Sequence, residues 1–153
     1  MNEMQKSAQQ VDWEALGRSL GYSAEELQTF RSHPNNVYVA ENAWRLDKWW
    51  IVAEVTASHG CAAGHQAGDK IYFSASGTLE TAKSPSRICL HAFPGLASAV
   101  AVIQERIISG LDPNPSLFKH IGCIDVGVQC GGWGRIAFDV YGVPTSCETT
   151  DEH

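Results

Sequence analysis

The chain has 153 residues, of which 44% are hydrophobic and 18% charged, and its formal net charge at pH 7 is -6. This length and composition are typical of one globular domain with its own core, and they exclude wholesale disorder. The negative charge, together with the lack of a basic stripe, disfavours binding to nucleic acid. No apolar run approaches the roughly 20 residues that a membrane-spanning helix needs, so we expect no membrane contact.

The N-terminal ten residues are polar and lack the apolar centre of a signal peptide. We therefore expect a cytoplasmic protein with reduced thiols. The five cysteines are an odd number, which also argues against a disulfide framework.

Residues 11–33 are predicted to form two short helices. Apolar residues recur at helical spacing in the first, and Gly21 suits its C-terminal end. Ser23 and Glu26 have the spacing of a capping box at the start of the second. A helix pair of this kind can read DNA, but the acidic balance favours a helical appendage, residues 1–34, that packs on the sheet or on a second subunit.

The rest of the chain predicts an α+β core over residues 35–143, followed by a flexible acidic tail over 144–153. A connector with an extended segment at 37–39 comes first. After it we expect a small, mainly antiparallel sheet covered by one long helix with an apolar stripe. The expected strands are residues 49–57, 70–75, 121–128 and 135–143, and the expected helix is 95–109.

Three tryptophans at positions 44, 49 and 50 surround the start of the first expected strand. They could form a stacking platform for flat ligands. Because they alternate with isoleucine and valine, they are better interpreted as core and as cover for the sheet.

The loop over residues 59–69 carries a thiol and an imidazole four residues apart, Cys61 and His65. Such a pair can chelate one ion from a single loop, and Cys89 and Cys123 would complete a set of three sulfur ligands and one nitrogen ligand. Zinc and iron both suit thiolate and imidazole. The alternative is that these cysteines are ordinary buried residues, because no spacing here is a tight metal knuckle.

Cys130 precedes Gly131, Gly132 and Trp133, in a glycine-rich segment. Consecutive backbone N–H groups there could form an anion-binding nest, and such donors would activate a neighbouring thiol. Cys130 would then be a catalytic nucleophile with His65 as its base, and Trp133 would cover a flat substrate held by the glycines. The alternative is a glycine-rich hairpin turn whose tryptophan packs on the sheet.

These segments resemble a family of small bacterial and archaeal proteins built around the motif Cys-Pro-x-Gly-His-x-x-Gly-Asp. The matching residues are Cys61, Gly64, His65, Gly68 and Asp69, followed by Cys89 and by Cys123 with Asp125. Ala62 replaces the proline of the motif, so the loop has lost a rigid position. The resemblance implies a shared role for the three cysteines and His65, but it carries no reaction with it.

The leading hypothesis is a cytosolic metal-binding protein that holds zinc or iron and acts as an enzyme on a small organic molecule. A second hypothesis is a metal-free thiol enzyme that uses Cys130. A third is a non-catalytic accessory subunit of a larger oxidoreductase, and a homo-oligomer is compatible with all three.

Overall fold

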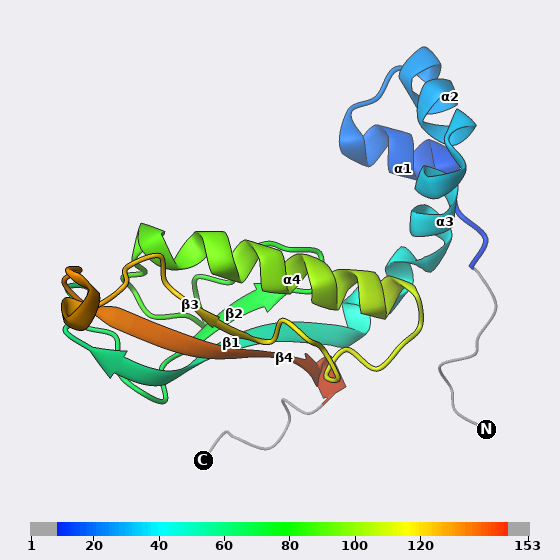
Figure 1. The fold of residues 1–153 in the computed structure, drawn as a ribbon. Coiled ribbons are helices and arrows are strands. Elements are labelled where there is room, and N and C mark those ends of the chain that lie inside the picture. The colour runs from blue at the N-terminus through cyan, green and yellow to red at the C-terminus, as the bar shows by residue number, and fades with distance from the viewer. Residues whose placement is uncertain (1–8, 147–153) are drawn as a thin grey trace.

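The computed structural model describes residues 9–146, and the segments 1–8 and 147–153 lie outside the described part. The fold is α+β, as expected: a four-stranded antiparallel sheet in the order β2-β1-β4-β3 lies against one long helix, α4 (Figure 1). The strands are β1 (Trp49–His59), β2 (Lys70–Ser74), β3 (His120–Gly122) and β4 (Arg135–Pro144).

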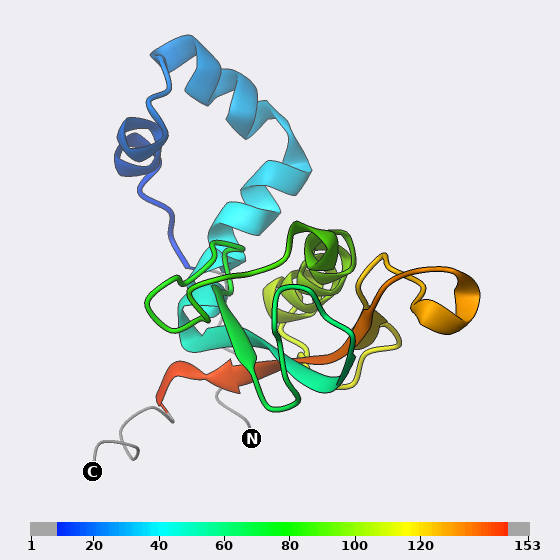
Figure 2. The ribbon, with the colours of Figure 1, turned by 90° about the vertical axis from the view of Figure 1, so that its left-hand side faces the viewer.

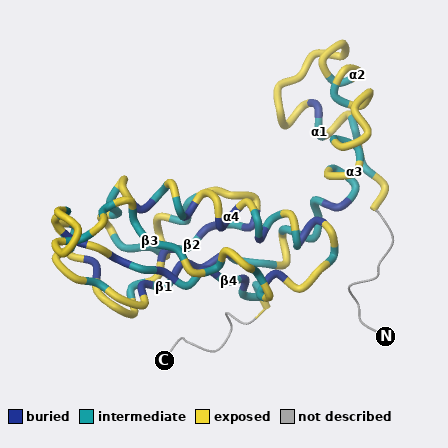
Figure 3. Tube along the Cα trace, viewed as in Figure 1, coloured by how far each residue is buried: buried dark blue, intermediate teal, exposed yellow. Residues whose placement is uncertain are grey.

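Helix α4 (Phe93–Ile108) covers one face of the sheet and closes the core. Pro94 occupies its first turn, where a proline has no hydrogen bond to lose. The helix buries an apolar stripe that includes Leu96, Ile103 and Ile107 against alternate residues of β1 and β4. Most buried residues therefore lie between α4 and the sheet, and the outward-facing side chains of β1 and β4 are mostly partly buried (Figure 3).

The two central strands, β1 and β4, run antiparallel along almost their whole length. Trp49 pairs with Pro144 at one end, and His59 pairs with Arg135 at the other. A register shift between Val55 and Ala57 changes the direction of β1 before its end. The loops that follow β1 and precede β4 therefore meet at one end of the sheet, which faces the viewer in Figure 2.

Three helices precede the sheet: α1 (Trp13–Leu20), α2 (Ala24–Ser32) and α3 (Pro34–Asn42), followed by a 3-10 segment, η2 (Ala43–Lys48). The end of α1 at Gly21 and the capping box of Ser23 and Glu26 are as predicted. The extended segment expected at 37–39 is wrong, because these residues form the middle of α3. Pro34 starts that helix, and α2 ends two residues before it at Ser32.

Figure 1 shows α1 and α2 standing away from the sheet, to which α3 and η2 connect them. Within this arm, Arg31 lies 4.9 Å above the ring of Trp13, and Gly17 passes close to Leu27. The predicted appendage is thus a three-helix arm whose contacts are largely internal.

Two other boundaries differ from the sequence prediction. The strand expected at 121–128 is reduced to the three residues of β3, because Cys123 begins an irregular loop. Pro144 belongs to β4, and most of the predicted tail lies outside the described residues. Between residues 9 and 146, no helix has the length and apolarity to cross a membrane.

Candidate functional site

Three of the four candidate metal ligands line one small pocket at the end of the sheet. Cys61 follows β1, Cys89 precedes the short 3-10 segment η3 (Leu90–Ala92), and Cys123 follows β3. The pocket has a volume of about 70 Å³. The described cysteines carry free thiols. Side chains from three distant segments of the sequence therefore line the same pocket.

Two glycines let the walls of this pocket approach each other. Gly60 has φ +64°, and a Cβ at this position would lie 2.9 Å from the carbonyl oxygen of Trp133. A Cβ on Gly134 would collide with the carbonyl group of Gly60. Only residues without side chains allow this close contact, which brings Cys61 to the start of β4.

Cys123 is held by the backbone of β4. Its own N–H donates to the carbonyl oxygen of Ile136 (3.1 Å), and its Sγ accepts from the N–H of Ile136 (3.4 Å). Cys61 and Cys123 also pack against the edge of the hydrophobic core. Cys61 and Cys123 are half-buried, and they contact the core while also lining the pocket.

The loop on both sides of Cys130 forms an anion nest, and the protein's own Asp125 fills it. The carboxylate accepts hydrogen bonds from the N–H groups of Gly127 (2.9 Å), Trp133 (3.1 Å) and Gly134 (3.2 Å). These donors lower the pKa of Asp125, and the nearby His91 contributes to the same effect. A Cβ on Gly132 would collide with this carboxylate, so the loop can pass around Asp125 only because residue 132 is a glycine.

His91 lies on the wall of the pocket, and the sequence analysis did not identify it. Its carbonyl oxygen accepts from the N–H of Ile124 (3.1 Å), which joins the start of α4 to the loop after β3. The signal in the sequence is the spacing of two between Cys89 and His91. That spacing places both residues in the short segment that leads into α4.

His65 lies in the same loop as Cys61 but off the wall of the pocket. The side chain is buried, and its Nδ1 is 3.6 Å from Oδ2 of Asp69. Its Nε2 is buried and has no hydrogen-bond partner in the described part of the chain. A ligating imidazole usually donates its other N–H to a carboxylate, and Asp69 lies on that side of His65 at a distance longer than a hydrogen bond.

Cys130 stands apart from the other thiols. It is exposed at the end of a 3-10 turn, η4 (Val128–Cys130), and does not line the pocket. Gly131 ends that turn with φ +84°. Trp133 is 87% exposed at the rim of the pocket. In the described part of the chain no hydrogen bond joins Cys130 to His65, so the expected nucleophile and base are not paired.

The structure thus defines an α+β protein with a thiol-lined pocket at one end of an antiparallel sheet. Within residues 9–146, no three His, Cys, Asp or Glu side chains are already grouped closely enough to hold a metal ion. No protein-family model matches the chain, and no curated protein or solved structure matches it either. The resemblance to the Cys-Pro-x-Gly-His-x-x-Gly-Asp proteins therefore stays a prediction.

Proposed function

We propose that this protein binds a zinc or iron ion through Cys61, Cys89 and Cys123, and that this ion is the centre of its activity. The observation that carries the proposal is the convergence of the three thiols on one pocket from segments after β1, before α4 and after β3. Thiolates bind zinc and iron strongly, and three of them leave a fourth position for an imidazole or a substrate.

The size of the pocket favours an ion over an organic molecule as its occupant. The pocket measures about 70 Å³, whereas sites for organic ligands measure about 300–1,000 Å³. The thiols must draw closer around the ion, because the described side chains are not yet grouped as a coordination shell. The loops at 60–69 and 123–134 contain glycines that allow such an adjustment.

Two imidazoles compete for the fourth position. His65 has the orphan Nε2 and the supporting Asp69, and it shares a loop with Cys61. His91 already lies on the wall of the pocket beside Cys89. We favour His65, because a buried imidazole nitrogen without a partner is costly unless a ligand satisfies it.

An enzyme that acts on a small organic molecule remains the finer form of this proposal, with the substrate approaching the ion past Trp133. The thiol-enzyme alternative has only the exposure of Cys130 in its favour. A stronger observation supports the accessory-subunit alternative: the apolar side chains of Leu90, Ile124 and Trp133 are exposed close to the pocket.

Metal analysis of protein purified without oxygen tests the proposal. We expect about one zinc or iron ion per chain, or, in apoprotein titrated with Co²⁺, the intense visible absorption of thiolate-bound cobalt. Cys61→Ser, Cys89→Ser and Cys123→Ser should each lower the metal content and the melting temperature, because binding to the folded state also stabilises it.

Cys130→Ser is the matched control, since this thiol is exposed and lies outside the pocket. It should keep both the metal and the melting temperature. His65→Ala should lose metal while His91→Ala keeps it, and the reverse result would assign the fourth position to His91. A wild-type protein without metal that binds no Co²⁺, or a Cys130→Ser variant that loses as much metal as the others, would overturn the proposal.

A further inference from the structure

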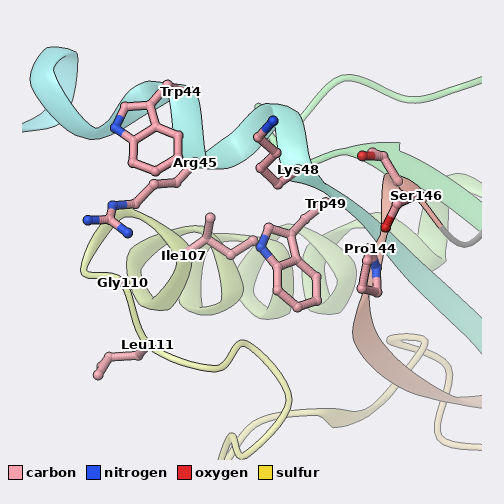
Figure 4. A pocket seen from close by; sticks show the side chains of 10 residues that line it. Trp44, Arg45, Lys48, Trp49, Ile107, Gly110, Leu111, Pro144 and Ser146 are labelled. Atoms are coloured by element: carbon pink, nitrogen blue, oxygen red, sulfur yellow. The ribbon is translucent and has the colours of Figure 1, made fainter. Parts of the chain in front are cut away.

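Two pockets lie at opposite ends of the sheet. The larger one surrounds Trp49 and adjoins Ser146, the last described residue of the chain (Figure 4). The smaller one is the thiol pocket, and the ten residues of β4 separate it from that end of the described chain, a span of roughly 30 Å. The rim of the thiol pocket also holds a cation, Arg135, which the proposed metal site does not use.

Arg135 is the first residue of β4, and its guanidinium has no partner among the described residues. Between residues 9 and 146 it forms no ion pair, hydrogen bond or ring contact. Arg18 and Lys70, by contrast, each pair with a carboxylate. Although acidic residues outnumber basic ones by 17 to 11 in this chain, no carboxylate of the described part binds Arg135, so the guanidinium is available to an anion from solution.

The side chain of Arg135 packs against two glycines. A Cβ on Gly127 would lie 3.5 Å from the Cβ of Arg135, and a Cβ on Gly122 would lie 3.9 Å from its Nε. The stem therefore lies beside the loop after β3, and the guanidinium begins beside Gly122, the neighbour of Cys123. This packing keeps the cation at the thiol pocket and reduces the side-chain entropy that it loses when it binds a ligand.

The carboxylate that lines the same pocket, Asp125, does not pair with Arg135. It accepts hydrogen bonds from the backbone N–H groups of Gly127, Trp133 and Gly134. The negative charge of Asp125 is therefore bound within its own loop. The guanidinium keeps its donors for a second carboxylate that arrives from outside.

Trp133 adds a flat apolar surface to the same rim. Its backbone N–H donates to Asp125, whereas its side chain is largely exposed. An indole on the rim of a pocket offers contact area to a flat apolar group. The pocket itself, at about 70 Å³, is too small for a whole organic molecule, so such a molecule must stay on the rim.

We propose that Arg135 binds the carboxylate of a small organic acid at the mouth of the thiol pocket, while the flat part of that acid lies on the ring of Trp133. A guanidinium presents parallel N–H donors that match the two oxygens of a carboxylate, and its single charge suits a single negative charge. The inference names the substrate class of the metal site and rests on the proposed function for that role. The binding itself needs no ion, because neither side chain is a metal ligand.

Titration of the full chain with 2-naphthoate, followed by NMR of side-chain N–H groups, tests this proposal. We expect saturable shifts of the Arg135 Nε–H and Trp133 indole signals at ~1 mM ligand, while the indole signal of Trp13, on α1, stays in place. The neutral analogue 2-naphthamide should bind at least about 5-fold more weakly, because it lacks the charge that the guanidinium recognises.

Arg135→Gln should weaken 2-naphthoate roughly 10-fold and leave 2-naphthamide unchanged. Arg18→Gln removes the same charge from α1, away from the sheet, and as the matched control it should bind 2-naphthoate like the wild type. Trp133→Ala removes an exposed ring and should weaken both ligands by a similar factor. This variant keeps the test open if Arg135→Gln fails to fold.

No saturable shift, equal binding of the neutral analogue, or wild-type binding by Arg135→Gln would overturn the inference. Metal analysis of the same samples separates it from the proposed function. A chain that holds no metal but binds 2-naphthoate through Arg135 would support the carboxylate site and refute the metal site. A chain that holds metal but does not bind 2-naphthoate would do the reverse.

Discussion

At the scale of single residues, Asp125 accounts for the conformation of the loop beside the thiol pocket. The sequence suggested an anion nest in the backbone after Cys130. Of that segment only Trp133 and Gly134 donate, together with Gly127, and the anion they bind is the protein's own Asp125. Gly132 and Trp133, predicted to hold a substrate, instead wrap around this carboxylate or donate to it. A pattern of glycines can predict that a nest forms, but the residue that fills it depends on how the loop closes.

Protonation of Asp125 should therefore loosen the loop beside the thiol pocket. Three backbone donors lower the pKa of Asp125 below its ordinary value of 3.8, so its contribution to stability is complete above that pH. The contribution disappears as the pH falls through the lowered pKa in the folded state. Asp125→Asn should lower the free energy of unfolding at pH 7, with a difference from wild type that shrinks toward pH 3.

Unfolding by urea at a series of pH values measures this effect. Glu105→Gln, an exposed carboxylate on α4, controls for the loss of one negative charge and should leave the pH profile close to that of the wild type. Profiles of wild type and Asp125→Asn that stay parallel down to pH 3 would show that the nest does not stabilise the ionised carboxylate.

At the scale of elements, the sequence predicted well wherever a local pattern and the tertiary contacts agree. The alternation in β1 and β4 and the stripe of α4 each match a buried face. The prediction of an extended segment at 37–39 is wrong because Val37 and Val39 favour strands by propensity alone. Pro34 starts a helix before them, and α3 continues through them. The convergence of Cys61, Cys89 and Cys123 depends on strand order, and neither spacing nor composition determines that order.

Deletion of residues 1–34 should leave a folded core. The capped helices α1 and α2 contact each other and α3, and they stand away from the sheet (Figure 1). We expect the truncated chain to unfold cooperatively, with a melting temperature within a few degrees of the full chain, in a thermal scan followed by circular dichroism.

Gly17→Leu provides a matched point change in the arm, because even a Cβ there would lie 3.0 Å from Leu27. It should disturb the contact between α1 and α2 and leave the main transition of the core unchanged. A truncated chain that lacks a cooperative transition would show that the arm is part of the single core.

At the scale of the whole molecule, the end of the sheet that carries the thiols is unusually apolar on its surface. Leu90 and Trp133 are 76% and 87% exposed, and the loop after β3 exposes Ile124, Val126 and Val128. Exposed apolar side chains gathered in this way mark contact surfaces. We expect the protein to associate with a second copy of itself through this face.

Sedimentation at several concentrations measures this association. The average mass of the wild type should rise from 16.6 kDa toward twice that value as the concentration increases, and Trp133→Ser should shift the midpoint at least about 10-fold to higher concentration. Leu20→Ser removes an apolar side chain that is 49% exposed on α1, and it should have no effect. A monomer at every concentration would exclude the dimer.

The pairing of β1 with β4 also decides when the thiol pocket can form. These strands join segments far apart in the chain, as in the hydrogen bond from Thr56 to the carbonyl oxygen of Ala137, which spans 81 residues. Closing so long a loop is slow compared with forming the helices, and during synthesis β1 must wait for β4 to emerge. Until then Cys61 and Cys123 have no shared pocket, so the proposed metal site can form only after β4 has joined the sheet.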